Sequence, residues 1–139
     1  MSENYFRHLL AVECQTDKKG ALTFVSWIEA WTRLKLAHPD ATYEIHQTED
    51  GKFLHGEGFV MCSVTLPSAL LFNGPNDAAR VLEPITHTMW LPVMDHKNKA
   101  IPNPDTTQIN KAIMRCLAKA CAMHGLGSYV YMGEDLPVV

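Results

Sequence analysis

The segment from Thr106 to His124 constrains the fold more than any other part of the chain, because it is long, helical in pattern and largely apolar. At about 100° per residue, four polar side chains fall within a sector roughly 80° wide: Gln108, Lys111, Arg115 and Lys119. Most other positions carry apolar or small residues, and no acidic residue occurs between Gln108 and His124. The pattern predicts a helix that begins at Thr106 or Thr107, ends near His124 and is packed on most of its circumference, with Gly125 as its stop.

The cations of this helix contrast with the charge of the whole chain. With 12 Lys and Arg against 15 Asp and Glu, the net charge is −3, which counts against a nucleic-acid-binding domain unless basic residues gather in one place. Lys111, Arg115 and Lys119, the basic stripe, do gather, and the preceding loop adds Lys97 and Lys99, flanked by polar residues at His96, Asn98 and Asn103. Cations about one turn apart can follow the phosphates of a nucleic-acid strand.

The basic stripe also has a purely structural interpretation. Its cations are equally typical of the solvated face of an amphipathic helix. They could also pair with carboxylates of the same chain, such as Glu134 and Asp135. The sequence alone leaves the nucleic-acid and the structural interpretations open.

The first half of the chain predicts a helix followed by antiparallel strands. Thr23 or Ser26 can cap a helix that runs to about Ala37 and ends before Pro39, with an apolar stripe at Trp27, Trp31 and Leu34. Thr42 to Thr48 alternates in polarity, and the Asp-Gly turn of residues 49–52 indicates a hairpin whose return strand begins at Phe53 to His55. Residues 59–66 are strand formers and predict a buried central strand.

The later elements are less regular. An early turn is expected at Asp17 to Gly20, and Pro67 and Pro84 favour a loop over residues 67–86 with a short helix around Asp77 to Leu82. Thr88 to Met94 predicts a strand that Pro92 confines to an edge or a bulge. A polar loop follows over residues 95–104, and Tyr129 to Met132 predicts a last short strand. The expected fold is α+β: an antiparallel β-meander of three to four strands packed against a long C-terminal helix and a shorter N-terminal helix.

Length and composition place further bounds on the protein. At 139 residues the chain fits one domain, residues 1–139, that can bury a proper core. The four cysteines form no C-x-x-C pair and are expected to be free thiols in a reducing cytoplasm. The N-terminus has no secretory signal pattern, and no apolar run approaches the ~18 residues of a membrane span, so an intracellular, soluble protein is expected.

Three sequence blocks resemble a known family. They are Leu91 to Pro102 (LPVMDHKNKAIP), Asn110 to Ala120 (NKAIMRCLAKA) and Met123 to Pro137 (MHGLGSYVYMGEDLP). Together with Leu22 to Trp27 and His38 to Ile45, they are similar in order and spacing to the phage single-strand DNA annealing proteins of the Sak type, which are grouped with the Erf and RecT recombinases. The resemblance covers most of residues 4–137, although residues 67–86 look longer than the family's usual connection between strands.

The resemblance implies a function and a set of residues. It implies ATP-independent annealing of complementary single strands in phage recombination by a ring or filament homo-oligomer, with no cofactor and no catalytic residue. Carried over by position, the DNA-binding residues are Lys97, Lys99, Lys111, Arg115 and Lys119. The pattern of charged and polar residues adds four candidates for secondary contacts: His96, Asn98, Arg33 and Gln108. A phage exonuclease and a host single-strand-binding protein are further implied partners, although the chain ends soon after the third block, where an extension recruiting the latter would follow.

Other functional interpretations remain for a few residues. Trp27 and Trp31 could stack on bases, but their helical spacing favours packing in the core, and Tyr129 and Tyr131 favour core or interface. Asp95 beside polar residues admits a metal-dependent nuclease, although no second carboxylate or metal-binding histidine spacing accompanies it. A phosphate-binding glycine loop of the ATPase type is missing. An oligomeric scaffold with the same fold and little DNA affinity is the alternative that the acidic composition favours.

Overall fold

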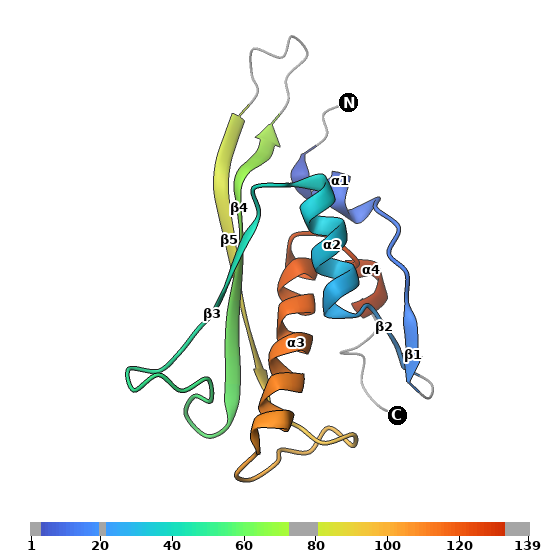
Figure 1. Ribbon diagram of the computed structural model, residues 1–139. Coiled ribbons are helices and arrows are strands. Elements are labelled where there is room, and N and C mark those ends of the chain that lie inside the picture. The colour runs from blue at the N-terminus through green and yellow to red at the C-terminus, as the bar shows by residue number, and fades with distance from the viewer. Residues whose placement is uncertain (1–3, 20–21, 73–80, 133–139) are drawn as a thin grey trace.

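The computed structural model describes residues 4–19, 22–72 and 81–132, and it places a three-stranded sheet on one side of the molecule with the helices on the other (Figure 1). The elements in chain order are α1 (Tyr5–Leu10), β1 (Asp17–Lys19), β2 (Leu22–Phe24), α2 (Trp27–Ala37), β3 (Thr42–Ile45), β4 (Phe59–Phe72), β5 (Val81–Pro92), α3 (Thr106–Met123) and α4 (Ser128–Tyr131). The α+β fold predicted from the sequence, with an antiparallel sheet, a long C-terminal helix and a shorter N-terminal helix, is confirmed.

The sheet has the order β3-β4-β5, and both pairings are antiparallel. The predicted central strand is confirmed, because β4 lies between the other two strands and is largely buried. Its side chains on the helix side are at most 1% exposed: Val60, Cys62, Val64 and Leu66. These residues meet the apolar side of α3, and the two layers share one core. We call the helix-covered side of the sheet its inner face and the opposite side its outer face.

The longest feature of the sheet is the hairpin of β4 and β5, which corrects the prediction of a loop over residues 67–86. β4 continues to Phe72 and β5 already begins at Val81, so both prolines lie within strands. Pro67 and Pro84 sit opposite each other, where the register shifts between Leu66 and Ala69. A bulge tolerates proline because the ladder is already interrupted there. Of the expected short helix, residues 81 and 82 are strand, and residues 77–80 lie outside the described residues.

The long helix α3 is confirmed with its predicted limits. Asp105 caps its N-terminus, where its carboxylate accepts the N–H of Gln108 and the Gln108 side chain accepts the N–H of Asp105, both at 2.9 Å. At the other end Gly125 has φ +108°, and a Cβ there would lie 2.6 Å from the carbonyl oxygen of Phe6. Only glycine fits both requirements, so the chain can turn directly after α3.

Two predicted strands are wrong. β3 covers only Thr42–Ile45 and pairs with β4, so Phe53 to His55 is not its return strand; a tight turn at residues 48–52 is nevertheless present. Residues 128–131 form the one-turn helix α4 and no strand, because Gly127 with φ +70° redirects the chain into a helical turn. The turn expected at Asp17 to Gly20 is wrong for residues 17–19, which form the strand β1 paired with β2, and Gly20 lies outside the described residues.

Helix α2 is confirmed, with Ser26 as the cap that accepts the N–H of Glu29. Its core-facing side differs from the expected stripe: Ala30 and Leu34 are buried, Trp31 packs against the core from its edge, and Trp27 is 38% exposed. Core packing is therefore confirmed for Trp31 and is wrong for Trp27. No helix in the described ranges is long and apolar enough to cross a bilayer.

Candidate nucleic-acid interface

The solvent-exposed part of the basic stripe consists of Lys111 and Arg115 on α3. The helix is rigidly held, because the positions on its other sides pack into the core. In the described part of the chain, neither cation has a carboxylate within ion-pairing distance. The pairing considered with Glu134 and Asp135 concerns residues outside the described ranges. One turn of a packed helix thus presents two adjacent positive charges to solvent.

Lys119 lies in a different environment from the other two cations. It is half-buried, and its ammonium lies 5.8 Å from the centre of the Tyr131 ring of α4. The flanking Ala118 and Ala122 are buried as well, so the stripe narrows towards the C-terminal end of α3. The pKa of the buried Cys116 thiol is lowered mainly because the S–H of Cys62 donates to the Cys116 sulfur. The positive charge of Lys119 contributes to the same shift.

The loop that connects β5 to α3 is built around Asp95. One oxygen of its carboxylate accepts the backbone N–H groups of Lys97 at 2.8 Å and Lys99 at 3.0 Å, and these bonds lower the pKa of Asp95. The backbone N–H of Asp95 in turn donates to the carbonyl of Lys99. Asn98 adopts φ +61° in the turn, a conformation that Asn tolerates well.

The loop therefore presents its cations with a fixed negative charge nearby. The side chains of Lys97 and Lys99 are exposed, as are those of His96 and Asn98. Because Asp95 is ionised, the two lysines and this carboxylate sum to a charge of +1. The sequence reasoning counted the lysines and missed this role of Asp95, although an aspartate two residues before the first lysine is a recognisable turn signal.

Two predicted secondary contacts are engaged within the fold. Gln108 is half-buried and completes the cap of α3. Arg33 forms an ion pair with Glu29, with 2.8 Å between Nε and Oε2, and its charge is thereby compensated. This i,i+4 spacing was readable in the sequence.

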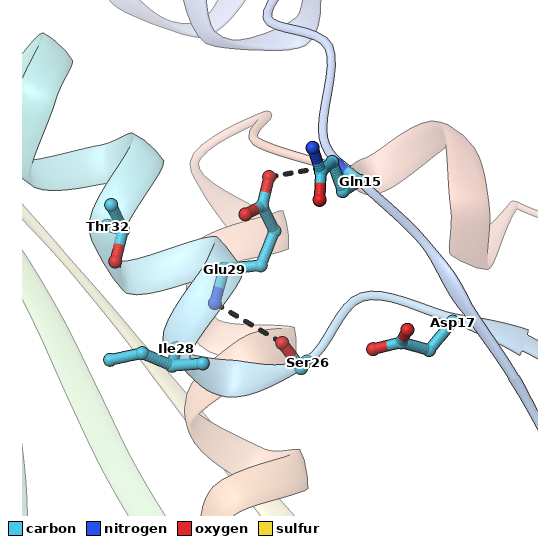
Figure 2. A pocket seen from close by; sticks show the side chains of 6 residues that line it. All are labelled: Gln15, Asp17, Ser26, Ile28, Glu29 and Thr32. Carbon is cyan, nitrogen blue, oxygen red and sulfur yellow. Dashed lines mark hydrogen bonds between the residues drawn. The ribbon is translucent and has the colours of Figure 1, made fainter.

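Glu29 also borders the cavity shown in Figure 2, which has a volume of about 270 Å³. The same carboxylate oxygen accepts the backbone N–H of Gln15 at 2.9 Å, and Arg33 is the main cause of the lowered pKa of Glu29. The cavity is lined by Gln15, Asp17, Ser26, Ile28, Glu29 and Thr32. Its two carboxylates disfavour an anionic ligand, so nucleic acid is not expected there.

The nuclease hypothesis depended on Asp95 and its polar neighbours. The carboxylate of Asp95 holds the backbone of its own turn, as described above. Across residues 4–19, 22–72 and 81–132, no group of three or more His, Cys, Asp or Glu side chains is arranged to hold a metal ion. The described geometry therefore supplies no support for metal-dependent cleavage.

Comparison with known proteins identifies a family for this chain. A family model described as Sak Single Strand Annealing Protein matches residues 8–138. No curated protein and no solved structure gives a significant match. The family model spans nearly the whole chain, including all three blocks in which the resemblance was noted, and the chain therefore belongs to the Sak family of single-strand annealing proteins.

Proposed function

We propose that this protein binds single-stranded DNA through its basic stripe and promotes the pairing of complementary strands without nucleotide hydrolysis. The observation that carries the proposal is the exposed pair Lys111 and Arg115, which stand one turn apart on a packed helix and have no ion-pair partner in the described ranges. Lys97 and Lys99 add contacts from the loop, and Lys119 extends the stripe. His96 and Asn98, exposed in the same loop, are the nearest secondary contacts.

The chemistry of annealing fits this arrangement. A strand must be held by its phosphates while its bases stay accessible to a complement, and cations on a rigid helix can do this without reading sequence. Lys111 and Arg115 are separated by about 6 Å along the helix axis. Binding should therefore tolerate any sequence and weaken steeply with salt.

The wider biological setting is also part of the proposal. A homo-oligomer, as a ring or a filament, would repeat the site along one strand and raise the affinity without new contacts. We place this activity in phage recombination within the cytoplasm of a bacterial host. A phage exonuclease that produces single strands, and a single-strand-binding protein that coats them, are the partners that such a reaction would use.

The proposal is tested with the double variant Lys111→Ala/Arg115→Ala. Each phosphate contact on a single strand contributes about 0.7 to the slope of log affinity against log salt, so losing two contacts should flatten that slope by about 1.4. Fluorescence anisotropy with a labelled oligonucleotide at several salt concentrations measures affinity and slope together. Lys52→Ala is the matched control, because Lys52 is exposed on the loop after β3 and already lies 3.7 Å from Asp50. An affinity and slope equal to those of the unmodified protein would refute the assignment.

The acidic net charge favours one second candidate, an oligomeric scaffold or accessory protein with little DNA affinity. The two functions differ in a strand-annealing assay with labelled complementary oligonucleotides. An annealing protein accelerates pairing in proportion to its concentration. A scaffold leaves the spontaneous rate unchanged.

A further inference from the structure

The outer face of the sheet carries a group of aromatic side chains at the end where β4 begins and β5 ends. Trp90 is 57% exposed there, and its ring centre lies 5.6 Å from that of Phe59 in an edge-on arrangement. Phe59 is stacked in turn with His55, with 5.4 Å between ring centres and 23° between ring planes. Trp90 pairs with Met61 on β4, so these rings and Met61 form one continuous patch, which we call the aromatic patch.

The aromatic patch is not needed by the core of the described chain. All four helices lie on the inner face of the sheet (Figure 1), and the core is built from the residues of that face. The described elements therefore leave more than half of Trp90 exposed. An exposed tryptophan among packed rings usually marks a contact surface, because a binding partner would bury a large apolar area that is otherwise in contact with water.

The outer face directly next to the aromatic patch carries hydroxyl side chains, and these narrow the choice of occupant. Beyond the aromatic patch, Ser63 pairs with Thr88 and Thr65 pairs with Thr86, with 2.7 Å between the hydroxyl oxygens in each pair. A folded protein surface of the obligate kind would require a continuous apolar area. Flat rings next to hydroxyl groups suit a ligand with a flat π face and polar edges, which describes a nucleobase.

Positive charge next to the aromatic patch comes from the Lys97 and Lys99 loop, whereas Glu44 and Glu57, which is exposed in the turn before Phe59, add negative charge. The Lys97 and Lys99 loop leaves the sheet beside the aromatic patch, since the N–H of Val93 donates to the carbonyl of Gly58, the residue before Phe59. Among the outer-face residues of β4 from 59 to 65 and the residues paired with them on β3 and β5, Glu44 is the one carboxylate of the described strands. Its Oε2 lies 3.7 Å from Nδ1 of His46. The loop then leads along the chain into α3, the helix that carries the basic stripe.

We propose that the aromatic patch stacks one or two nucleobases of the bound single strand, with Trp90 as the main platform and the Lys97 and Lys99 loop holding the adjacent phosphates. This inference rests on the proposed function, because it assigns a base-contacting surface to the same strand. Stacking on a π face does not depend on base identity, so it preserves the sequence tolerance that annealing requires.

The test compares Trp90→Leu and Trp90→Phe in binding to an oligo-dT and to an abasic strand of the same length. Trp90→Leu keeps an apolar side chain without a π face and should weaken oligo-dT binding about fivefold or more. Trp90→Phe should retain most of the affinity, and both variants should bind the abasic strand like the unmodified protein. Trp27→Leu is the matched control, because Trp27 is also partly exposed but lies on α2 in the helical layer.

Three results would overturn the inference. They are unchanged oligo-dT affinity of Trp90→Leu, an equal loss on the abasic strand, and a changed oligomer size of Trp90→Leu without DNA, which would make the patch a contact between copies. If Trp90→Leu does not fold, the quenching of tryptophan fluorescence by oligo-dT is compared between Trp90→Phe and the unmodified protein. The quenching should largely disappear in Trp90→Phe, and quenching as strong as in the unmodified protein would contradict the proposal. A protein that binds no single strand at all refutes the proposed function itself, whereas equal affinity for oligo-dT and the abasic strand refutes only this inference.

Discussion

The stability of the fold should depend on pH through His124, the residue that caps the C-terminus of α3. Its side chain is fully buried, and Nε2 lies 2.8 Å from the carbonyl oxygen of Val64, to which it donates. Nδ1 is buried with no hydrogen-bond partner among the described residues. Protonation would therefore place a second N–H where nothing accepts it. Burial, with a further contribution from the neighbouring His87, lowers the pKa of His124 from 6.5 to about 4.

The magnitude follows from the difference between the two pKa values. In the unfolded chain the imidazole takes up a proton as the pH falls through 6.5, whereas the folded protein resists protonation until about pH 4. The unfolded state thus binds more protons in this window, and stability falls as the pH falls. At 1.36 kcal/mol for each pH unit, the full effect is about 3.4 kcal/mol, complete below pH 4 and absent well above pH 6.5.

His124→Gln isolates this contribution, because the Gln amide can still donate to Val64 but does not titrate. Urea unfolding at fixed protein concentration, followed from pH 7.5 to pH 4, gives the free energy of unfolding of both proteins. The unmodified protein should lose about 3 kcal/mol more than the variant over this range. His96→Gln, which removes an exposed histidine of the loop, should follow the unmodified protein. Parallel pH profiles of His124→Gln and the unmodified protein would refute the reasoning.

Two further substitutions test the ends of α3. Gly125→Ala combines a positive φ with a Cβ that would meet the Phe6 carbonyl at 2.6 Å, so urea unfolding should show a loss larger than that of Gly51→Ala, where φ is +80° and the space is open. The Gly51 variant should lose only the conformational term of about 1–2 kcal/mol, and equal losses at both sites would contradict the clash. Asp105→Ala removes the carboxylate that caps the N–H of Gln108 and should cost about 1 kcal/mol in the same assay, while an unchanged midpoint would show that the cap is dispensable.

The two longest helices, α2 and α3, could be predicted well because their signals are local, whereas α1 was not expected and α4 was expected as a strand. The cap at Ser26, the stop at Gly125 and the 3.6-residue period of α3 all lie within a few residues of the structure they determine. The same locality explains why Trp27 was wrongly expected to be buried. A helical period gives the spacing of an apolar stripe, but it does not show which side of the helix the rest of the core will cover. Ala30, a small residue, proved to be the buried position.

The strands were harder to predict because pairing is not local. Considered alone, Pro67 and Pro84 each indicate the end of a strand. Because they face each other at one register shift between β4 and β5, both strands continue past them. The return strand expected at Phe53 was wrong for a related reason: an Asp-Gly turn indicates a reversal of the chain but does not identify the partner strand. The partner of β3 is β4, on which the buried Cys62 is paired with Ile45.

The candidate site shows the same division. The exposure of Lys111 and Arg115 follows from the helical period alone. In contrast, Trp90 was not singled out, because its position on an open face depends on the register between β5 and β4 and on the helices all covering the other face. Arg33 was retained as a possible contact although its i,i+4 pairing with Glu29 is a local signal.

The acidic composition and the proposed binding of DNA are compatible because electrostatic attraction in solution is a local quantity. At physiological ionic strength, charges separated by more than about 8 Å in solvent are largely screened from each other. α3 extends over about 27 Å and carries no acidic residue, so a phosphate at the basic stripe meets cations first. Two exposed cations release few counterions, however, and cannot alone hold a strand tightly at that salt concentration. Repetition of the stripe along one strand by several copies of the chain would supply the missing affinity, which is why we join oligomerisation to DNA binding as one mechanism.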